Sequence, residues 1–146
     1  MNRSALIAAA AATLLAAGCA GKINALTPTT STTGAIEVHA NQLPSDHAFT
    51  INTASTKAGP VAFTFVNDAT AEHEMIILKT DAPLDSLEVG KDFRVSEDAS
   101  VGEISETPAG KTVTQSFDLA PGKYILLCNI PLHYGQGMRL EFTVTA

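Results

Sequence analysis

From residue 35 onward, the chain carries a series of short apolar segments, each about the length of a strand. Residues 36–40 and 61–66 alternate large apolar with smaller or polar side chains, as strands with one buried face do. Residues 75–78 are apolar without a break, which is typical of a strand buried on both faces. Similar segments lie at residues 48–52, 112–117, 124–128 and 140–144. No long stretch has the helical period of about 3.6 residues, which argues against an all-α fold.

Turn-forming residues separate these segments. Ala58-Gly59-Pro60, Pro108-Ala109-Gly110 and Pro121-Gly122 each stand between two of them. Several short strands at this spacing predict one all-β sandwich domain over residues 35–146.

Residues 81–106 interrupt the strand pattern with eight acidic side chains against Lys91 and Arg94. Asp81 and Pro83 suit the N-cap and first turn of a short helix. We therefore expect an acidic loop or short-helix excursion on one side of the sandwich. We favour a solvated loop, because charge runs are usually solvated. The alternative is an acidic patch that steers a basic partner.

The first residues have the composition of an export signal. Arg3 precedes an apolar stretch at residues 5–17, as in a signal peptide. The sequence Leu15-Ala16-Ala17-Gly18-Cys19 then resembles the lipobox of bacterial lipoproteins, in which the cysteine is lipidated and becomes the first residue. An ordinary secretory signal, with Cys19 incidental, is the alternative.

These features predict a signal peptide at residues 1–18, a lipidated Cys19 and a flexible tether rich in Thr and Ser over residues 19–34. We expect the domain on the periplasmic side of the cell envelope. The resemblance mildly favours the outer membrane, because Ala20 stands where Asp usually signals retention in the inner membrane.

Composition narrows the range of partners. The chain has 9 basic and 15 acidic side chains and a net charge of −6, which gives no basic patch for nucleic acid. The longest apolar run is shorter than the roughly 20 residues that span a bilayer. A lipid anchor would then be the only membrane attachment.

Four side chains have the chemistry of a metal site. Cys128, His133 and Met138 follow the spacing C-x4-H-x4-M, and His73 begins an apolar strand upstream. Structural zinc sites use Cys and His alone, and calcium and magnesium take oxygen ligands. Two imidazoles, one thiolate and a weak axial thioether are the ligands of a blue-copper electron-transfer site. The alternatives are a buried core Cys128, a loop His133 and a core-filling Met138.

Residues 119–138 resemble the C-terminal copper loop of the cupredoxins. A Pro121-Gly122 turn leads into a strand with Tyr124 four residues before the cysteine. The loop length is similar to that of rusticyanin and auracyanin. The resemblance implies a Greek-key β-sandwich and one type 1 copper ion. In it, His73 reaches the loop ligands Cys128, His133 and Met138 from a neighbouring strand.

The residue after the first histidine departs from the family pattern. Plastocyanins and azurins commonly have Asn there, and its side chain ties the two ligand loops together; here the residue is Glu74. We favour an outward-pointing Glu74 at the strand edge. The alternative is a hydrogen bond to a ligand loop, with a negative charge that favours Cu(II).

The resemblance also implies a docking surface. In cupredoxins the loop histidine lies near the surface in an apolar patch, which Pro131, Leu132 and Tyr134 would form here. Such a patch should be small, because redox encounters bury little area. We expect a monomer that meets a redox protein, a cytochrome or a copper oxidase.

Several other residues have simpler interpretations. Met75 lies inside an apolar strand and is expected in the core. His39 and His47 lack a soft ligand nearby in sequence and are expected at the surface or a strand edge. With Cys19 in the lipid anchor and Cys128 in the metal site, no disulfide is expected.

The sequence favours a carrier over an enzyme. It has no nucleophile elbow, phosphate loop or telling pair of carboxylates, and a multicopper enzyme needs more than one copper-binding unit. We expect a non-enzyme that shuttles one electron between redox partners. The alternative is a copper chaperone or resistance protein, which would more often use Met- and His-rich tracts; only three Met occur.

Overall fold

The computed structural model describes residues 34–42 and 47–146. This part of the chain forms nine strands and no helix. The strands are β1 (Ile36–Gln42), β2 (His47–Ile51), β3 (Ser55–Lys57), β4 (Gly59–Asn67), β5 (His73–Lys79), β6 (Ser100–Thr107), β7 (Thr112–Leu119), β8 (Gly122–Leu127) and β9 (Arg139–Thr145).

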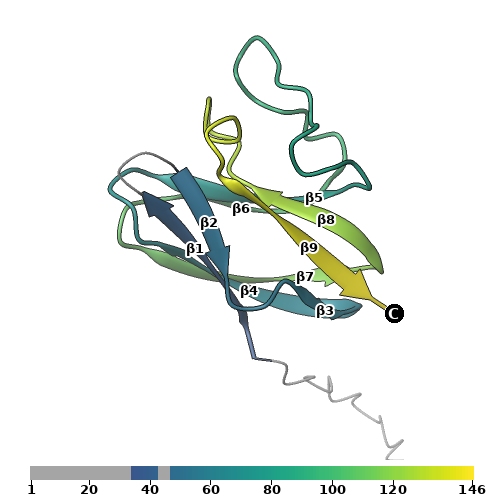
Figure 1. Cartoon of the computed structure of the whole chain (residues 1–146). Coiled ribbons are helices and arrows are strands. Elements are labelled where there is room, and N and C mark those ends of the chain that lie inside the picture. Colours follow the sequence, from purple (N-terminus) through teal and green to yellow (C-terminus); the bar gives the residue numbers. More distant parts are fainter. Residues whose placement is uncertain (1–33, 43–46) are drawn as a thin grey trace, which may run out of the picture. The chain divides into compact units, whose positions relative to one another are not determined.

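The strands form two sheets that face each other (Figure 1). One has the order β2-β1-β4-β7 and the other the order β3-β9-β8-β5-β6. Each sheet contains one parallel pair, β1 with β4 and β3 with β9, among antiparallel pairs. The chain passes from one sheet to the other at β2–β3, β3–β4, β4–β5, β6–β7 and β7–β8. The prediction of an all-β sandwich is confirmed.

The main core lies between the sheets. β4 contributes alternate residues, Val61, Phe63 and Phe65, which are 0–5% exposed. Phe63 meets Phe142 of β9 edge to face, with ring centroids 5.3 Å apart. The period-two pattern of β4 therefore reflects one face toward the core and one face toward solvent.

β5 is buried on both faces, which explains its unbroken apolar sequence. Met75 and Ile77 point into the main core, as expected for Met75. Ile76 and Leu78 belong to a second apolar cluster, which includes Leu84, Leu87 and Val95. These last three lie in residues 80–99, which we call the covering segment because they lie over the outer face of β5 and β8.

The region expected as an excursion differs from the prediction in two ways. Residues 100–107 form strand β6 and pair with β5, so the excursion ends at residue 99. No helix forms at residues 81–84. The sequence pattern did not predict β6, because β6 is an edge strand in which Ile104 and Thr107 are the buried residues.

The predicted signal peptide, the lipidated Cys19 and the tether up to residue 33 lie outside the described residues. Across residues 34–42 and 47–146, no helix is long and apolar enough to cross a bilayer.

Candidate metal centre

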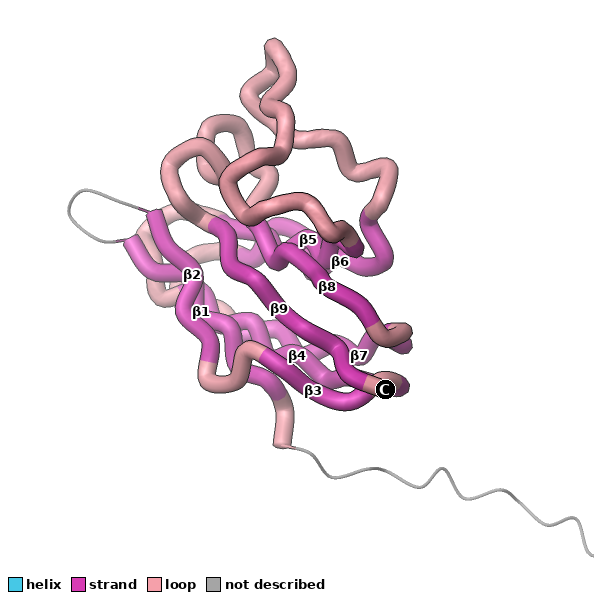
Figure 2. The backbone as a smooth tube through the Cα atoms, turned by 45° about the vertical axis from the view of Figure 1, so that its right-hand side comes forward, coloured by secondary structure: helices cyan, strands magenta, loops and turns pink. Residues whose placement is uncertain are grey.

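The predicted ligands meet at one end of the sandwich. His73 is the first residue of β5, and Cys128 directly follows β8. Residues 128–138, which we call the ligand loop, connect β8 to β9 and carry His133 and Met138. This loop and the covering segment project from the same end of the sheets (Figures 1 and 2). β5 and β8 are hydrogen-bonded neighbours, which brings their ligands together.

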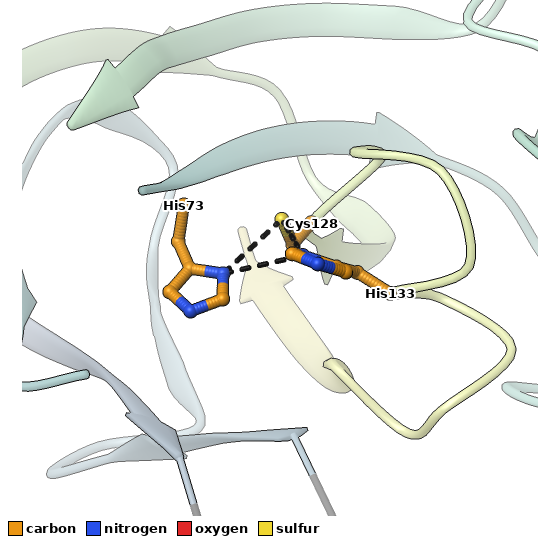
Figure 3. Close-up of side chains that lie close together, drawn as sticks. All are labelled: His73, Cys128 and His133. Atoms are coloured by element: carbon orange, nitrogen blue, oxygen red, sulfur yellow. Dashed lines mark hydrogen bonds between the residues drawn. The ribbon is translucent and has the colours of Figure 1, made fainter. Parts of the chain in front are cut away.

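Three donor atoms converge in Figure 3. The Nδ1 atoms of His73 and His133 are 3.2 Å apart. The Sγ atom of Cys128 lies 3.2 Å from Nδ1 of His133 and 3.8 Å from Nδ1 of His73. A circle through three points at these separations has a radius of about 2.0 Å, which is the length of a metal–imidazole bond. His73, Cys128 and His133 are thus close enough together to hold one metal ion between them.

Met138 closes the ligand loop beside these three residues. The backbone N–H of Cys128 donates to the carbonyl of Met138 at 3.0 Å, and the N–H of Met138 donates to the carbonyl of His133 at 3.0 Å. Gly137 has a φ of 104°, a conformation that glycine adopts without strain. This turn returns the loop to β9, and the Met138 side chain is fully buried.

The donor set fits copper. Thiolate and thioether suit Cu(I), and imidazole suits both oxidation states. Burial raises the pKa of the Cys128 thiol to about 11, so the thiol keeps its proton at neutral pH until a metal displaces it. Metal binding should therefore release a proton. His73, Cys128 and Met138 are 0% exposed, whereas His133 is partly exposed.

Glu74 points inward, so the favoured prediction of an outward side chain is wrong. It is 3% exposed, and its Oε1 atom accepts a hydrogen bond from the backbone N–H of Asn129 at 3.0 Å. Nη1 of Arg94 lies 3.9 Å from the same oxygen. Glu74 therefore links the strand of His73 to the ligand loop, which is the alternative that the sequence left open.

Burial raises the pKa of Glu74 to about 7. Desolvation is the main cause, the nearby carboxylate of Glu106 adds to it, and Arg94 opposes it. Ionisation of this carboxyl group costs free energy, because few hydrogen-bond partners replace the water that it loses on burial.

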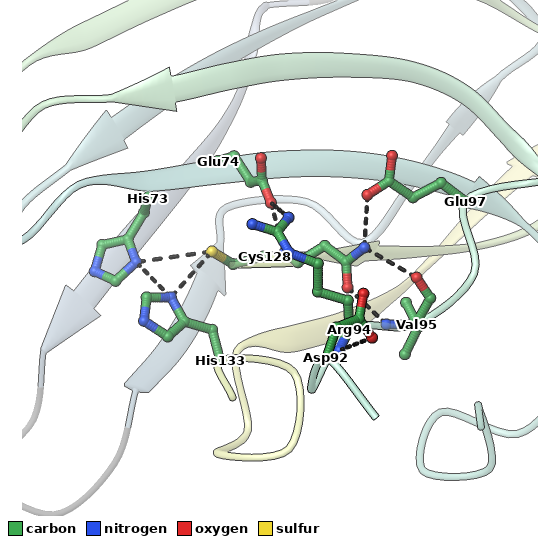
Figure 4. A network of polar contacts seen from close by, with 9 residues as sticks. His73, Glu74, Asp92, Arg94, Val95, Glu97, Cys128 and His133 are labelled. Carbon is green, nitrogen blue, oxygen red and sulfur yellow. Dashed lines mark hydrogen bonds and ion pairs between the residues drawn. The ribbon is translucent and has the colours of Figure 1, made fainter. Parts of the chain in front are cut away.

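Asn129 joins the ligand loop to the covering segment, and Figure 4 labels its partners Val95 and Glu97. Its side-chain Oδ1 accepts from the N–H of Val95 at 2.8 Å. Its Nδ2 donates to the carbonyl of Val95 at 3.0 Å and to Oε1 of Glu97 at 2.6 Å. Asn129 is 1% exposed. With Glu74, it connects β5, the ligand loop and the covering segment in one buried network.

The interpretation of residues 81–106 as a solvated loop is also wrong in part. Tyr134 of the ligand loop donates its hydroxyl to the carbonyl of Leu84 at 2.7 Å and accepts from the N–H of Leu87 at 3.3 Å. Arg139 pairs with Asp85 at 2.6 Å. The acidic residues of this segment are exposed, although Glu97 also accepts a hydrogen bond from Asn129. Leu84 and Leu87 pack in the second apolar cluster with Tyr134.

The exposed apolar residues near His133 differ from those predicted for the apolar patch. Leu132 is 47% exposed and Pro131 is exposed, as expected. Tyr134 is 4% exposed and packs in the second apolar cluster, so it does not belong to the patch. Its place is taken by Phe93 of the covering segment, which is 54% exposed and accepts a hydrogen bond from Leu132 at its carbonyl oxygen.

His39 lies outside the centre. His39 is partly exposed on β1 and pairs with Asp68 at 2.5 Å, which agrees with the expected surface position. The side chain of His47 is not among those described.

Sequence reasoning missed Asn129, Arg94 and Phe93. A polar residue directly after a ligand cysteine was the available signal for Asn129. Nothing in the local sequence predicts a role for Arg94 or Phe93. They lie near the centre because of how the long connection between β5 and β6 folds.

Comparisons with known proteins agree with this geometry. Residues 36–145 match the family model described as copper binding proteins of the plastocyanin/azurin family. No curated protein matches the chain by sequence. Among solved structures, reduced auracyanin from Roseiflexus castenholzii has 23% identity and a TM-score of 0.56, covering 75% of this chain and 95% of that one. Rusticyanin from Thiobacillus ferrooxidans has 21% identity and a TM-score of 0.60, covering 75% of each chain. These structures share the fold.

Proposed function

Because the chain belongs to the plastocyanin/azurin family of copper-binding proteins, we propose that it shuttles one electron between redox partners at the cell envelope. The chain is a copper electron-transfer protein, and His73, Cys128, His133 and Met138 are arranged as its type 1 copper site. When bound, copper supplies a one-electron couple at potentials within biological reach.

The uneven burial of the ligands carries this proposal. His73, Cys128 and Met138 are 0% exposed, and only His133 reaches the surface among the four. The buried ligands exclude water and hold one geometry through both oxidation states. The exposed edge of His133 offers the short path to a partner.

The buried network favours the carrier over the copper chaperone. A chaperone must open its site to release the metal. Here Asn129 and Glu74 hold the ligand loop against β5 and the covering segment by buried hydrogen bonds. Such a site changes little during an electron transfer, which keeps the reorganisation small.

Voltammetry of the copper-loaded protein distinguishes the two functions. We expect a reversible one-electron wave that persists over many cycles in the presence of a Cu(I) chelator. Loss of the wave, with copper recovered on the chelator, would favour the chaperone.

We place the protein on the periplasmic side, attached through Cys19. The tether of about 15 residues would let the domain reach roughly 20 Å from the membrane. Fractionation of cells tests this: the protein should be found with membranes and label with a fatty acid, whereas Cys19→Ser should prevent the labelling. A wild-type protein without fatty acid would contradict the anchor.

A further inference from the structure

Asn67 is a buried polar residue at the end of β4, close in sequence to the first ligand. Its exposed fraction is 0%, and residues 68–72 connect it to His73, the first residue of β5. A buried amide costs free energy unless its polar atoms find hydrogen-bond partners. The partners of Asn67 therefore show which parts of the chain it holds together.

The side chain of Asn67 forms three hydrogen bonds. Its Nδ2 atom donates to the carbonyl oxygen of Ala71 at 2.8 Å and to that of Thr107 at 2.7 Å. Its Oδ1 atom accepts from the backbone N–H of Ala69 at 3.0 Å. An amide nitrogen has two hydrogens to donate, so both are used here. The side chain thus binds the connection to β5 and also the end of β6.

The backbone of Asn67 is also fixed. Its N–H donates to the carbonyl oxygen of Lys111 at 2.9 Å, and its own carbonyl accepts from the N–H of Gly110 at 2.8 Å. These two bonds attach the end of β4 to the turn between β6 and β7. The side chain of Asn67 therefore reaches the connection to β5 from a backbone that is itself held in place.

Thr107 links Asn67 to the first ligand. Thr107 is the last residue of β6 and the antiparallel ladder partner of His73. The ladder between β5 and β6 is irregular here, with a register shift just after His73. On the other side of β5, the ladder with β8 begins only at Ile76. The regular sheet therefore holds the backbone of His73 weakly, and the side chain of Asn67 supplies a second anchor.

We propose that Asn67 is a positioning residue of the copper site, whose buried amide sets the place of the His73 imidazole relative to the other ligands. This inference rests on the proposed function, because it concerns the same copper site. Metal–ligand distances are defined within about 0.2 Å, so a small displacement of His73 changes its bond to copper. Such a change alters the affinity for copper and the balance between its two oxidation states.

Spectroscopy of copper-loaded variants tests this proposal. Asn67→Ala removes all three side-chain bonds. Asn67→Ser is the milder change, because its hydroxyl can still donate one bond, and it supplies folded protein if the Ala variant does not fold. Both variants are uncharged, so a change at the copper does not come from an added charge.

Two control variants separate positioning from stability. Asn52→Ala is the same substitution at an amide that accepts from the backbone N–H of Glu37 at 3.1 Å. Tyr124→Phe removes a hydrogen bond from a residue that is 2% exposed, and that bond goes to the carbonyl of Ala120. Neither control removes a bond to residues 67–73 or to Thr107.

We expect the dissociation constant for Cu(II) to rise at least tenfold in Asn67→Ala and less in Asn67→Ser. The thiolate-to-copper absorption bands, the copper hyperfine splitting in the EPR spectrum and the reduction potential should change in the same order. Both controls should keep the wild-type values. In the metal-free protein, amide hydrogen exchange of residues 68–73 should become faster in the two Asn67 variants alone.

Wild-type spectra and copper affinity in the folded Asn67 variants would overturn the positioning role, even if those variants are less stable. Equal spectral changes in Tyr124→Phe would overturn it too, because any lost buried bond would then have the same effect. A wild-type protein that binds no copper would instead overturn the proposed function itself.

Discussion

The carboxyl group of Glu74 lies next to a metal ligand in a strand and is almost completely buried. It accepts the N–H of Asn129, the residue after Cys128. A single side chain thereby fixes the separation of two ligand-bearing strands. The family's usual Asn would be neutral, whereas this group can carry a charge close to the centre, so it offers a means of setting the reduction potential.

The raised pKa of Glu74 predicts a pH dependence of stability in the metal-free protein. Its folded pKa of about 7 exceeds the ordinary 4.5, so the folded state holds the proton more tightly than the unfolded state. The resulting stability is complete below pH 4.5 and is lost as the pH rises through about 7. The free energy of unfolding should fall by about 3 kcal/mol over this range because of Glu74.

Urea unfolding at several pH values measures this effect. Glu74→Gln should remove most of the decline between pH 4.5 and 7. Glu141→Gln, which changes an exposed residue of β9, should leave it in place. The same decline in Glu74→Gln as in the wild type would mean that other groups cause it.

The covering segment packs on the β-sandwich and supports the ligand loop of the metal centre. Its apolar residues bury the outer face of β5 and β8, and its backbone meets the ligand loop at Tyr134 and Asn129. The segment has no strand or helix of its own, so its position depends on these contacts. Its order should therefore respond to single changes in the ligand loop.

Tyr134→Phe should loosen the covering segment. The change removes the bonds of the hydroxyl to Leu84 and Leu87, which should cost about 1–2 kcal/mol. Hydrogen exchange of residues 81–98 should become faster. Tyr124→Phe is the matched control, because the bond it loses is to the carbonyl of Ala120, which lies outside the segment. Equal exchange in both variants would show that Tyr134 does not hold the segment.

Gly102 of β6 marks a close approach between the two sheets. A Cβ atom there would lie 2.3 Å from Cδ1 of Phe117 on β7. Gly102→Ala should therefore destabilise the protein by about 1–3 kcal/mol through overpacking, as measured by chemical unfolding.

Gly34→Ala is the control for this change, because nothing lies within 4 Å of an added Cβ there. The double variant with Phe117→Leu should recover part of the loss. A Gly102→Ala protein as stable as the wild type would mean that the sheets separate without cost.

For the molecule as a whole, the sequence predicted the sandwich and the four ligands. Three ligands lie within eleven residues, so their spacing can be recognised in the sequence without knowledge of the fold. The strand patterns of residues 61–66 and 75–78 are also local, and both strands occur.

The remaining features depend on contacts between distant residues. Glu74 is buried because the ligand loop supplies a donor and the covering segment supplies Arg94. Tyr134 is buried because its hydroxyl finds partners fifty residues away, at Leu84. The charged residues of the covering segment suggested that the whole segment is exposed to solvent, although its leucines face the sheet. No period in the sequence reveals which side of such a segment packs.

The binding of copper tests the central claim most directly. Cu(II) is added to the metal-free protein, and the visible spectrum and the copper content are recorded together with those of Cys128→Ser. We predict one copper per chain and an intense thiolate-to-copper band that disappears in Cys128→Ser, while that variant stays folded. A folded wild-type protein that stays colourless with Cu(II) would contradict the account.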